Sequence, residues 1–266
     1  MGGEGGEHQE SMRNLKSAGN MASSAAIKLA KKELRSAMKQ KLSTISQESI
    51  NVQSTAVFER ITSFKVYQNA KHIGVYLSMP TGEIQTDAIV RHALESGKQV
   101  FVPYLHKSQT PSPNTPRSVM EMVDLRSLSD YDSLTRDGWG IPTIDAENIR
   151  EREHILGNST KKETRQLDMI LMPGVAFDTD PESGYVRRLG HGKGFYDYFL
   201  HRYMQGRGSQ TKEPPESPGA DVLLYGLALH EQLMQAETDP PVPIGEHDHL
   251  LHGLLVGDGR LVQGAA

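Results

Sequence analysis

Short apolar runs alternate with amphipathic stretches along most of this chain, and that alternation restricts the fold more than any other feature of its 266 residues. Residues 72–78 and 99–104 are predicted strands, and the helix predicted between them, 87–95, is capped by Thr86 and stopped by Gly97. The elements predicted after them are strands at 120–125, 167–177 and 222–229, a helix at about 195–203, and a terminal hairpin that turns at 258–259. Strands separated by helices favour a parallel sheet covered on both faces, so the sequence predicts one α/β domain with a mostly parallel sheet.

The N-terminal region and three internal segments differ in composition from this alternating core. Residues 1–22 are rich in Gly and Glu and lack the apolar side chains that stabilise an ordered segment. A disordered tail is therefore predicted before a folded domain of residues 23–266. Within the domain, polar or Pro-, Ser- and Gly-rich segments predict surface-loop insertions near 106–118, 148–166 and 205–219.

A helix is predicted to follow the tail, because apolar residues recur at helical spacing from residue 24 onward. The stripe consists of Ile27, Ala30, Leu34, Met38, Leu42 and Ile45. Basic residues, among them Lys31 and Arg35, lie along another face one turn apart. Taken alone, that basic face is most simply a solvated helix surface.

Composition excludes several classes of protein. The chain has 29 Lys and Arg against 33 Asp and Glu, a net charge of −4, so no overall basic field predicts a nucleic-acid partner. It has no cysteine, which excludes disulfides, cysteine metal sites and a cysteine nucleophile. No apolar run approaches the roughly 20 residues of a membrane span. The N-terminal composition suits neither a secretory signal nor a transit peptide, so we expect a cytoplasmic protein, with a mitochondrial location left open.

The run from Arg188 to Asp197 contains three glycines at alternate positions, Gly190, Gly192 and Gly194. Glycines let backbone N–H groups approach an anion closely, and a helix predicted to begin at the end of this run would add the positive end of its dipole. The spacing matches neither a Walker loop nor a dinucleotide-binding fingerprint, and spacing alone fits a flexible turn equally well. A phosphate-binding loop is therefore one of two interpretations at this point.

The preceding segment is a short apolar run, residues 167–178, that contains Pro173-Gly174-Val175-Ala176-Phe177-Asp178. This segment and the following Arg188-Leu-Gly-His-Gly-Lys-Gly-Phe-Tyr-Asp197 run together resemble the signature of the 5-formyltetrahydrofolate cyclo-ligase family, also called 5,10-methenyltetrahydrofolate synthetases. The resemblance implies a three-layer α/β/α fold related to the sugar-phosphate isomerase and coenzyme A transferase architecture. It also implies an ATP- and Mg²⁺-dependent enzyme acting on a reduced folate.

The resemblance also implies which residues bind ATP. Lys31 and Arg35 match a Lys-x-x-x-Arg pair that contacts the nucleotide phosphates in the family. The glycine run supplies the remaining ATP-binding positions, which are Arg188, Gly190, His191, Gly192, Lys193, Gly194, Phe195 and Tyr196. Among them, Lys193, Arg188 and Tyr196 are the expected catalytic residues.

A second group of residues is expected to bind the folate. Glu83, in a loop after a predicted strand, matches a glutamate that hydrogen-bonds the pterin ring in the family; alone, it would most simply be an exposed loop acid. Trp139, the only tryptophan, is expected to stack on the ligand, with ordinary packing as an equal alternative. Implied pocket positions are Leu77, Met79, Glu83, Trp139, His191 and Phe195.

The implied metal ligands are Asp197 and Asp248, which would share one Mg²⁺. Zinc is the alternative, because His247, His249 and His252 surround Asp248 and imidazole suits that metal. The chain departs from the family pattern at two positions. Many members of the family have Arg or another residue in place of His191, and the family usually has an aspartate in place of His252.

The reaction implied by the resemblance converts 5-formyltetrahydrofolate to 5,10-methenyltetrahydrofolate with release of ADP and phosphate, through an N5-iminium phosphate. We expect a monomer, and the preference for polyglutamylated substrate is left open. The alternatives are a small-molecule kinase or sugar-phosphate isomerase on the same scaffold, or a non-catalytic folate- or nucleotide-binding protein.

Overall fold

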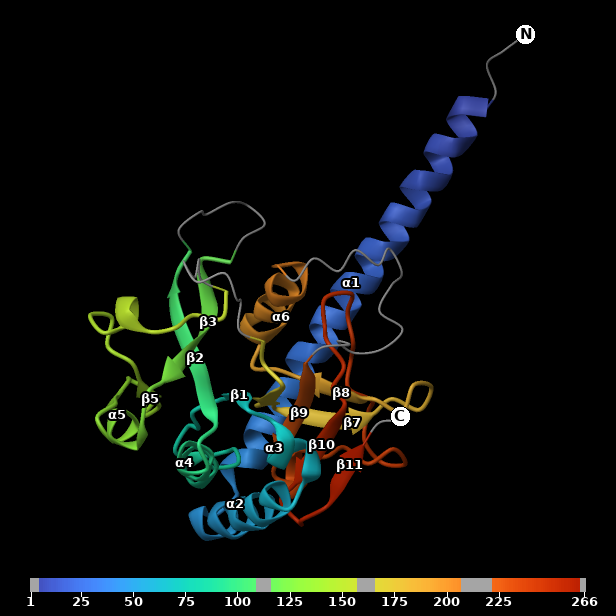
Figure 1. The fold of residues 1–266 in the computed structure, drawn as a ribbon. Coiled ribbons are helices and arrows are strands. Elements are labelled where there is room, and N and C mark those ends of the chain that lie inside the picture. The colour runs from blue at the N-terminus through green and yellow to red at the C-terminus, as the bar shows by residue number, and fades with distance from the viewer. Residues whose placement is uncertain (1–4, 109–115, 157–165, 207–221, 264–266) are drawn as a thin grey trace.

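The computed structural model describes residues 5–108, 116–156, 166–206 and 222–263. Its centre is a seven-stranded sheet in the order β11-β10-β9-β6-β1-β2-β3. The five central strands run parallel, and the edge strands β3 and β11 run antiparallel to their neighbours, which confirms the mostly parallel sheet (Figure 1). The strands are β1 (His72–Val75), β2 (Gln99–Lys107), β3 (Ser118–Leu125), β6 (Met169–Met172), β9 (Leu223–Ala228), β10 (Gly253–Val256) and β11 (Leu261–Gln263).

Both faces of the sheet are covered, as the apolar character of β6 requires. Met169 and Leu171 point into a core shared with helices α2 (Gln47–Thr62), α3 (Lys65–Asn69) and α4 (Asp87–Glu95). Their neighbours Ile170 and Met172 point into a core on the opposite face, shared with helix α6. Because side chains alternate along a strand, a strand buried on both faces is apolar throughout. Helix α6 spans Phe195–Gly206, and a separate two-stranded ribbon, β7 (Ala176–Thr179) and β8 (Val186–Leu189), joins it on that face.

The predicted strand at 167–177 is wrong in one respect, because it is divided between β6 and β7. The chain turns at Pro173-Gly174 and leaves the sheet, so β7 pairs with β8 instead. A Cβ at Gly174 would lie 2.4 Å from the Phe177 ring, which shows why this turn requires glycine. The turn matters for function because it places the β7–β8 ribbon, and the glycine run after it, beyond the end of β6.

Two further predictions require correction. Thr86 does not cap α4 through its side chain; its hydroxyl donates to the Tyr76 carbonyl at 2.7 Å and ties the helix to the end of β1. Strand β2 continues to Lys107, into the segment predicted as an insertion near 106–118. Gly97 ends α4 with a φ of +74°, and the C-terminal hairpin turns as predicted.

The smaller elements complete the described chain. They are α5 (Leu128–Asp132), β4 (Thr135–Arg136), β5 (Pro142–Thr143), the 3₁₀ turns η1 (Ile149–Glu151) and η2 (His230–Gln232), and the ribbon of β4 with β5. Each of the three predicted insertions includes residues outside the described ranges, namely 109–115, 157–165 and 207–219.

Helix α1 spans Gly5–Ser43 and extends beyond the body of the protein (Figure 1). It therefore begins within the segment for which composition predicts a disordered tail, and the disorder of residues 1–22 stays a prediction. The second half of α1 is fixed by Leu34 and Met38, which pack against Val175 and Leu189 of the β7–β8 region. This packing holds the basic face of α1 beside the glycine run.

The order of the strands locates a site. The chain proceeds from β1 to β2 on one side and returns to β6 on the other, so the strand order reverses between β1 and β6. In open parallel sheets, ligands bind beyond the carboxyl ends of the strands at such a reversal.

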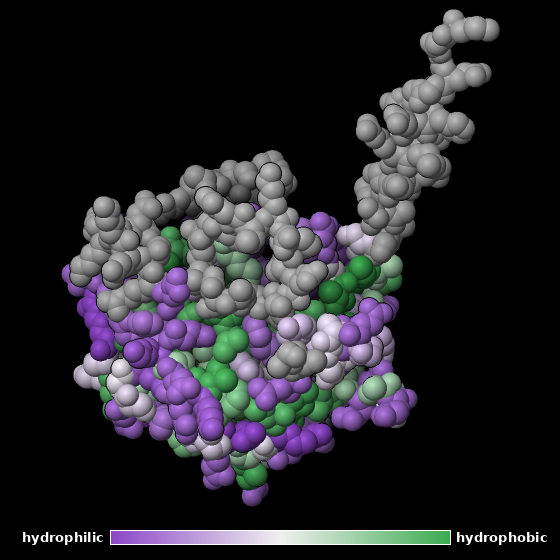
Figure 2. Space-filling view, turned by 45° about the vertical axis from the view of Figure 1, so that its right-hand side comes forward, coloured by the Kyte–Doolittle hydropathy of each residue, from purple (hydrophilic) through white to green (hydrophobic). Residues whose placement is uncertain are grey.

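Within the described residues, no helix is long and apolar enough to cross a membrane. The face in Figure 2 mixes hydrophilic and hydrophobic side chains over its described part.

Candidate active site

The glycine run forms the loop that joins β8 to α6. Gly192 and Gly194 have φ angles of +92° and +68°, a region that other residues rarely adopt. A Cβ at Gly190 would lie 2.9 Å from the Arg188 guanidinium, and one at Gly192 would lie 3.2 Å from that of Arg35. All three glycines are therefore needed. Gly194 is required for its backbone angles, Gly190 for the close approach of an arginine, and Gly192 for both reasons. The loop ends at Phe195, where α6 begins and directs its positive dipole end toward the loop.

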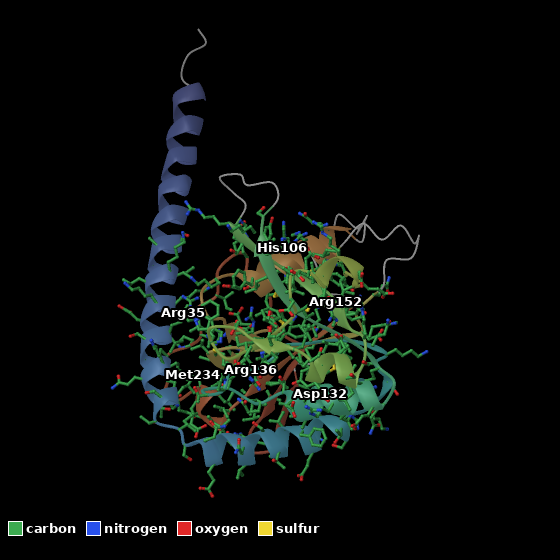
Figure 3. The ribbon with its side chains drawn as sticks, turned by 90° about the vertical axis from the view of Figure 1, so that its left-hand side faces the viewer. Arg35, His106, Asp132, Arg136, Arg152 and Met234 are labelled. Carbon is green, nitrogen blue, oxygen red and sulfur yellow. The ribbon has the colours of Figure 1, made fainter. Side chains whose placement is uncertain are left out.

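Helix α1 contributes Arg35 to this loop. Its Nε donates to the Gly190 carbonyl at 2.8 Å, and Figure 3 shows the residue where α1 lies against the rest of the protein. Burial lowers the pKa of Arg35 from its usual value, and the charge of Asp248 opposes that shift. The basic face of α1 is thus in contact with the loop and is not simply a solvated surface.

Arg188 lies beneath the loop and is almost completely buried, with 6% of its surface exposed. Its Nη2 donates to both carboxylate oxygens of Asp197 at 3.1 Å, and its Nη1 donates to the Pro173 carbonyl at 3.2 Å. Burial would raise the pKa of Asp197, but Arg188 and His249 outweigh it and lower this pKa to about 2. Asp197 is therefore ionised at any physiological pH.

The second predicted metal ligand, Asp248, also has a cationic partner. Its carboxylate forms an ion pair with the Lys31 ammonium of α1 and accepts a hydrogen bond from the Gly245 backbone. The adjacent residue, His249, directs its backbone N–H to Asp197 at 3.4 Å. Asp248 and Asp197 are thus linked through consecutive residues, and the lysine and arginines predicted for ATP surround them.

Glu83 is buried, with 4% of its surface exposed, so the simple interpretation of an exposed loop acid is wrong. One carboxylate oxygen accepts the Met79 backbone N–H at 2.6 Å, and the other lies 4.0 Å from His191 Nε2. Burial raises the pKa of Glu83 to about 7, with the Met79 hydrogen bond opposing the shift. A buried carboxyl with few partners is typical of a functional site, because burial without pairing destabilises its charged form.

His191 joins the glycine loop to the loop that carries Glu83. Its side chain is half-exposed, and burial together with Arg188 and Arg35 lowers its pKa. Tyr196, on the first turn of α6, has a buried hydroxyl that lacks a hydrogen-bond partner among the described residues. Its ring packs 5.6 Å from the Arg188 guanidinium. Burial raises the pKa of Tyr196, so this hydroxyl remains protonated and can donate to a bound ligand.

Trp139 is 74% exposed, which excludes a core role. Asp137 fixes its loop by accepting the backbone N–H groups of Trp139 and Ile141 at 2.9 and 3.0 Å. A Cβ at Gly140 would lie 2.8 Å from Pro80, so this loop contacts the one that carries Glu83. The ring is therefore held at the surface beside that loop.

The other predicted residues divide between the two loops. Leu77 is buried and Met79 half-buried at the end of β1, and Phe195 is half-buried at the start of α6. Lys193 is exposed at the tip of the glycine loop and forms no ion pair with any residue in the described ranges. Its ammonium is the freest of the predicted phosphate-binding cations, since Lys31 and Arg188 both have acidic partners.

The zinc alternative finds no support in the part of the chain that the structure describes, where no group of three or more His, Cys, Asp or Glu could hold a metal ion. His252 Nδ1 accepts the Leu224 backbone N–H at 3.0 Å, and its ring stacks on Tyr225. At this departure from the family pattern, the histidine therefore stabilises the packing of the sheet.

Two residues with a role at the site were missed by sequence reasoning. Gln85 donates from its amide to the carbonyls of Met79 and Glu83, at 2.9 and 3.0 Å, and so shapes the Glu83 loop. His249 contacts Asp197, yet the sequence suggested it only as a zinc ligand. The proximity of Gln85 to Glu83 in the sequence was the one available signal; the contact of His249 with Asp197 depends on the fold.

The fold and the site together define an α/β protein with a glycine loop at the start of α6 and a buried carboxyl at the carboxyl edge of its sheet. The model of the 5-formyltetrahydrofolate cyclo-ligase family matches residues 27–256, and the chain belongs to that family of ligases. A probable 5-formyltetrahydrofolate cyclo-ligase of Caenorhabditis elegans is 39% identical in sequence, over an alignment that covers 84% of this chain and 91% of the relative's length. The 5-formyltetrahydrofolate cyclo-ligase of Mus musculus is 30% identical, over an alignment that covers 87% of this chain and 96% of the relative's length.

The comparison with solved structures supports the fold. The NMR structure of the Aquifex aeolicus 5,10-methenyltetrahydrofolate synthetase aligns with a TM-score of 0.55 at 20% identity, covering 88% of this chain and 92% of the other. At that identity the likeness shows the architecture, and the family assignment rests on the sequence matches.

Proposed function

We propose that this enzyme converts 5-formyltetrahydrofolate to 5,10-methenyltetrahydrofolate, with conversion of ATP to ADP and phosphate. Family membership as a cyclo-ligase supports the reaction. The observation that carries the proposal for this chain is the closeness of two unlike regions, since His191 of the glycine loop lies 4.0 Å from the buried Glu83. A phosphate donor on the loop and a pterin on Glu83 would therefore meet at one point.

We name the two regions by their residues. The phosphate half consists of Lys31, Arg35, the 188–194 loop, Tyr196, Asp197 and Asp248. The folate half consists of Leu77, Met79, Glu83, Trp139 and Phe195, and His191 joins the halves. In the phosphate half, the loop N–H groups and Lys193 would neutralise the transferred γ-phosphoryl group, with Lys31 and Arg35 on the phosphate chain. Arg188 would act from below, by orienting Asp197 and facing Tyr196.

The carboxylates Asp197 and Asp248 fit a Mg²⁺ ion, because this metal takes one or two carboxylates together with phosphate oxygens. Asp197, with its pKa of about 2, is ionised and available as a ligand at neutral pH. When bound, Mg²⁺ would neutralise phosphate charge. Zinc is disfavoured by the structural role of His252.

The chemistry explains the need for ATP. A formamide on N5 is a poor electrophile, and its oxygen is a poor leaving group. The formyl oxygen would attack the γ-phosphorus to give an N5-iminium phosphate and ADP. N10 would then add to the formyl carbon and lose its proton to solvent, and phosphate would leave to form the 5,10-methenyl bridge. The protein supplies no nucleophile in this scheme; Glu83 holds the pterin, and the loop orients the phosphoryl group.

The direct test is incubation with 5-formyltetrahydrofolate and Mg-ATP, with the near-ultraviolet absorbance of the methenyl product followed alongside ADP. We expect one ADP per methenyl product. ATP consumption with another acceptor would favour a kinase, sugar-phosphate isomerisation without ATP would favour an isomerase, and binding without turnover would favour a storage protein. The monomeric state and cytoplasmic location remain predictions.

A further inference from the structure

Lys31 and Asp248 form an ion pair in the free protein, although the proposed function assigns Lys31 to the ATP phosphates and Asp248 to the Mg²⁺ ion. The pair joins α1 to the C-terminal segment across 217 residues of sequence, and it is largely shielded, with exposed side-chain fractions of 15% and 18%. It lies over Gly245, where a Cβ would be 3.8 Å from the lysine nitrogen and 3.5 Å from the aspartate oxygen.

This arrangement conflicts with simultaneous use of both groups. A lysine that contacts a nucleotide phosphate cannot keep its closest ion pair with a carboxylate that has turned to a metal ion. The proposed function therefore requires the pair to separate. Asp197 also forms an ion pair, with Arg188. The Arg188 guanidinium is buried and has two nitrogens besides the one bound to Asp197, so Arg188 can remain in place when Asp197 binds the metal.

We propose that the Lys31–Asp248 pair is an internal substitute for Mg-ATP, exchanged when the ligand binds. Lys31 passes from the carboxylate to a phosphate, while Asp248 passes from the ammonium to the cation that accompanies the phosphates. This inference rests on the proposed function. Each charge keeps an opposite partner before and after the exchange, so neither is left unpaired in the shielded site. ATP without Mg²⁺ would satisfy Lys31 but leave Asp248 facing phosphate without a cation. The exchange therefore selects the magnesium complex over free ATP.

The test measures binding of ATP in the presence of a chelator, by calorimetry, to the full chain and to Asp248→Asn. Asn can still accept the Gly245 N–H but leaves Lys31 free. We expect Asp248→Asn to bind Mg-free ATP about fivefold more tightly than the wild type, the scale of a partly exposed ion pair, while its affinity for Mg-ATP falls. The matched control is Glu246→Gln, which removes an exposed charge two residues away. It should leave both affinities close to those of the wild type.

The double variant Lys31→Met/Asp248→Asn separates the exchange from a general charge effect. If the gain for Mg-free ATP comes mainly from freeing Lys31, the double variant binds Mg-free ATP little better than Lys31→Met alone. A gain that persists in the double variant, an equal gain in Glu246→Gln, or no gain in Asp248→Asn would overturn the exchange. A wild-type chain that binds neither Mg-ATP nor free ATP would instead overturn the proposed function, and the exchange with it. Unfolding curves of the free variants provide a second measure, because the exchange predicts non-additive effects of the two substitutions only without Mg-ATP.

Discussion

The phosphate half and the folate half of this site lie on one edge of the sheet but are prepared for their ligands in opposite ways. In the phosphate half, Lys31, Arg188, Asp197 and Asp248 are satisfied by one another before any ligand arrives. In the folate half, the Glu83 carboxylate accepts one hydrogen bond from the described residues, and Trp139 lies exposed at the surface. Under the proposed function, the phosphate half would exchange partners when its ligand binds, whereas the folate half would only acquire them.

The difference follows from charge and burial. Four charged groups close together in a shielded region would repel or suffer desolvation if each lacked a partner, so internal pairs stabilise the free state. Among the described residues, no Lys, Arg or His nitrogen lies closer to the Glu83 carboxyl than His191 Nε2 at 4.0 Å, and burial raises the pKa of Glu83. Asp197 in the phosphate half, with its lowered pKa, thus remains ionised at neutral pH, whereas Glu83 in the folate half, with its raised pKa, titrates near neutrality. The predictions below test this contrast.

The largest effect is expected at Lys193, which among the described residues has neither an acidic partner, as Lys31 and Arg188 have, nor a backbone hydrogen bond like that of Arg35 to Gly190. Lys193→Ala should lower kcat by roughly 10²–10³, the scale for removing one preorganised group that faces transition-state charge. Melting temperature should barely change, since the side chain is exposed. Lys39→Ala, which removes an exposed lysine elsewhere on α1, is the control and should leave kcat unaltered. A loss of thermal stability in Lys193→Ala would show that the lysine is structural.

Asp197→Asn tests whether the internal pairs of the phosphate half contribute to folding. The pKa of Asp197 is lowered to about 2, so the carboxylate stabilises the fold above its unfolded pKa, and this contribution disappears as pH falls through 2. The variant should be less stable at pH 7 by about 2 kcal/mol, and the difference from the wild type should shrink between about pH 4 and pH 2. Denaturant unfolding across this pH range measures it. A pH-independent difference would contradict the charge pairing.

The same substitution tests the shared metal. Asp197→Asn and Asp248→Asn should each raise the Mg²⁺ concentration for half-maximal rate. The double variant should be little worse than the more damaging single variant, because groups that act as a unit are not additive. Independent and additive effects with an unchanged Mg²⁺ requirement would remove both aspartates from the site.

Glu83→Gln tests the folate half. We expect KM for the folate to rise about tenfold, the cost of one charge-assisted hydrogen bond, with KM for ATP nearly unchanged. The pKa of Glu83 is raised to about 7, so its contribution to stability is fully present below its unfolded pKa and is lost as pH rises through 7. The wild type should therefore lose stability between about pH 4.5 and pH 7, and Glu83→Gln should not. The control is Glu147→Gln, which removes an exposed loop acid and should keep the pH dependence of the wild type. If Glu83→Gln also keeps that pH dependence, the titration belongs to another group.

The sequence predicted the architecture and the phosphate half more completely than the folate half. Apolar periodicity located the parallel strands, and the alternating glycines marked the loop because backbone geometry requires them at fixed positions. The division of 167–177 into β6 and β7 was missed, since an apolar run shows burial but not which strand it pairs with. The burial of Glu83 could not be read from its neighbours either, because it depends on how the loop after β1 packs beneath the glycine loop.

The ion pairs of the site were beyond local sequence reasoning for a related reason. Lys31 and Asp248 are 217 residues apart, and only the packing of α1 against the β7–β8 region brings them together. The resemblance to the family named both residues as ligand-binding positions but said nothing of their contact in the free protein. Patterns within a segment predict elements, whereas the electrostatic state of a site depends on the assembled fold.

The smallest effect is expected at Trp139, which has no role in the core. Trp139→Ala should raise KM for the folate about fivefold, the scale of one aromatic stacking contact, and should leave melting temperature unchanged because the ring is 74% exposed. Trp139→Phe should retain most of the affinity, since it keeps an aromatic face. Trp139 is the only tryptophan, so its fluorescence in the wild type reports folate binding directly. An emission that does not respond to saturating folate would place the ring outside the folate half, and the contrast between the halves would then rest on Glu83 alone.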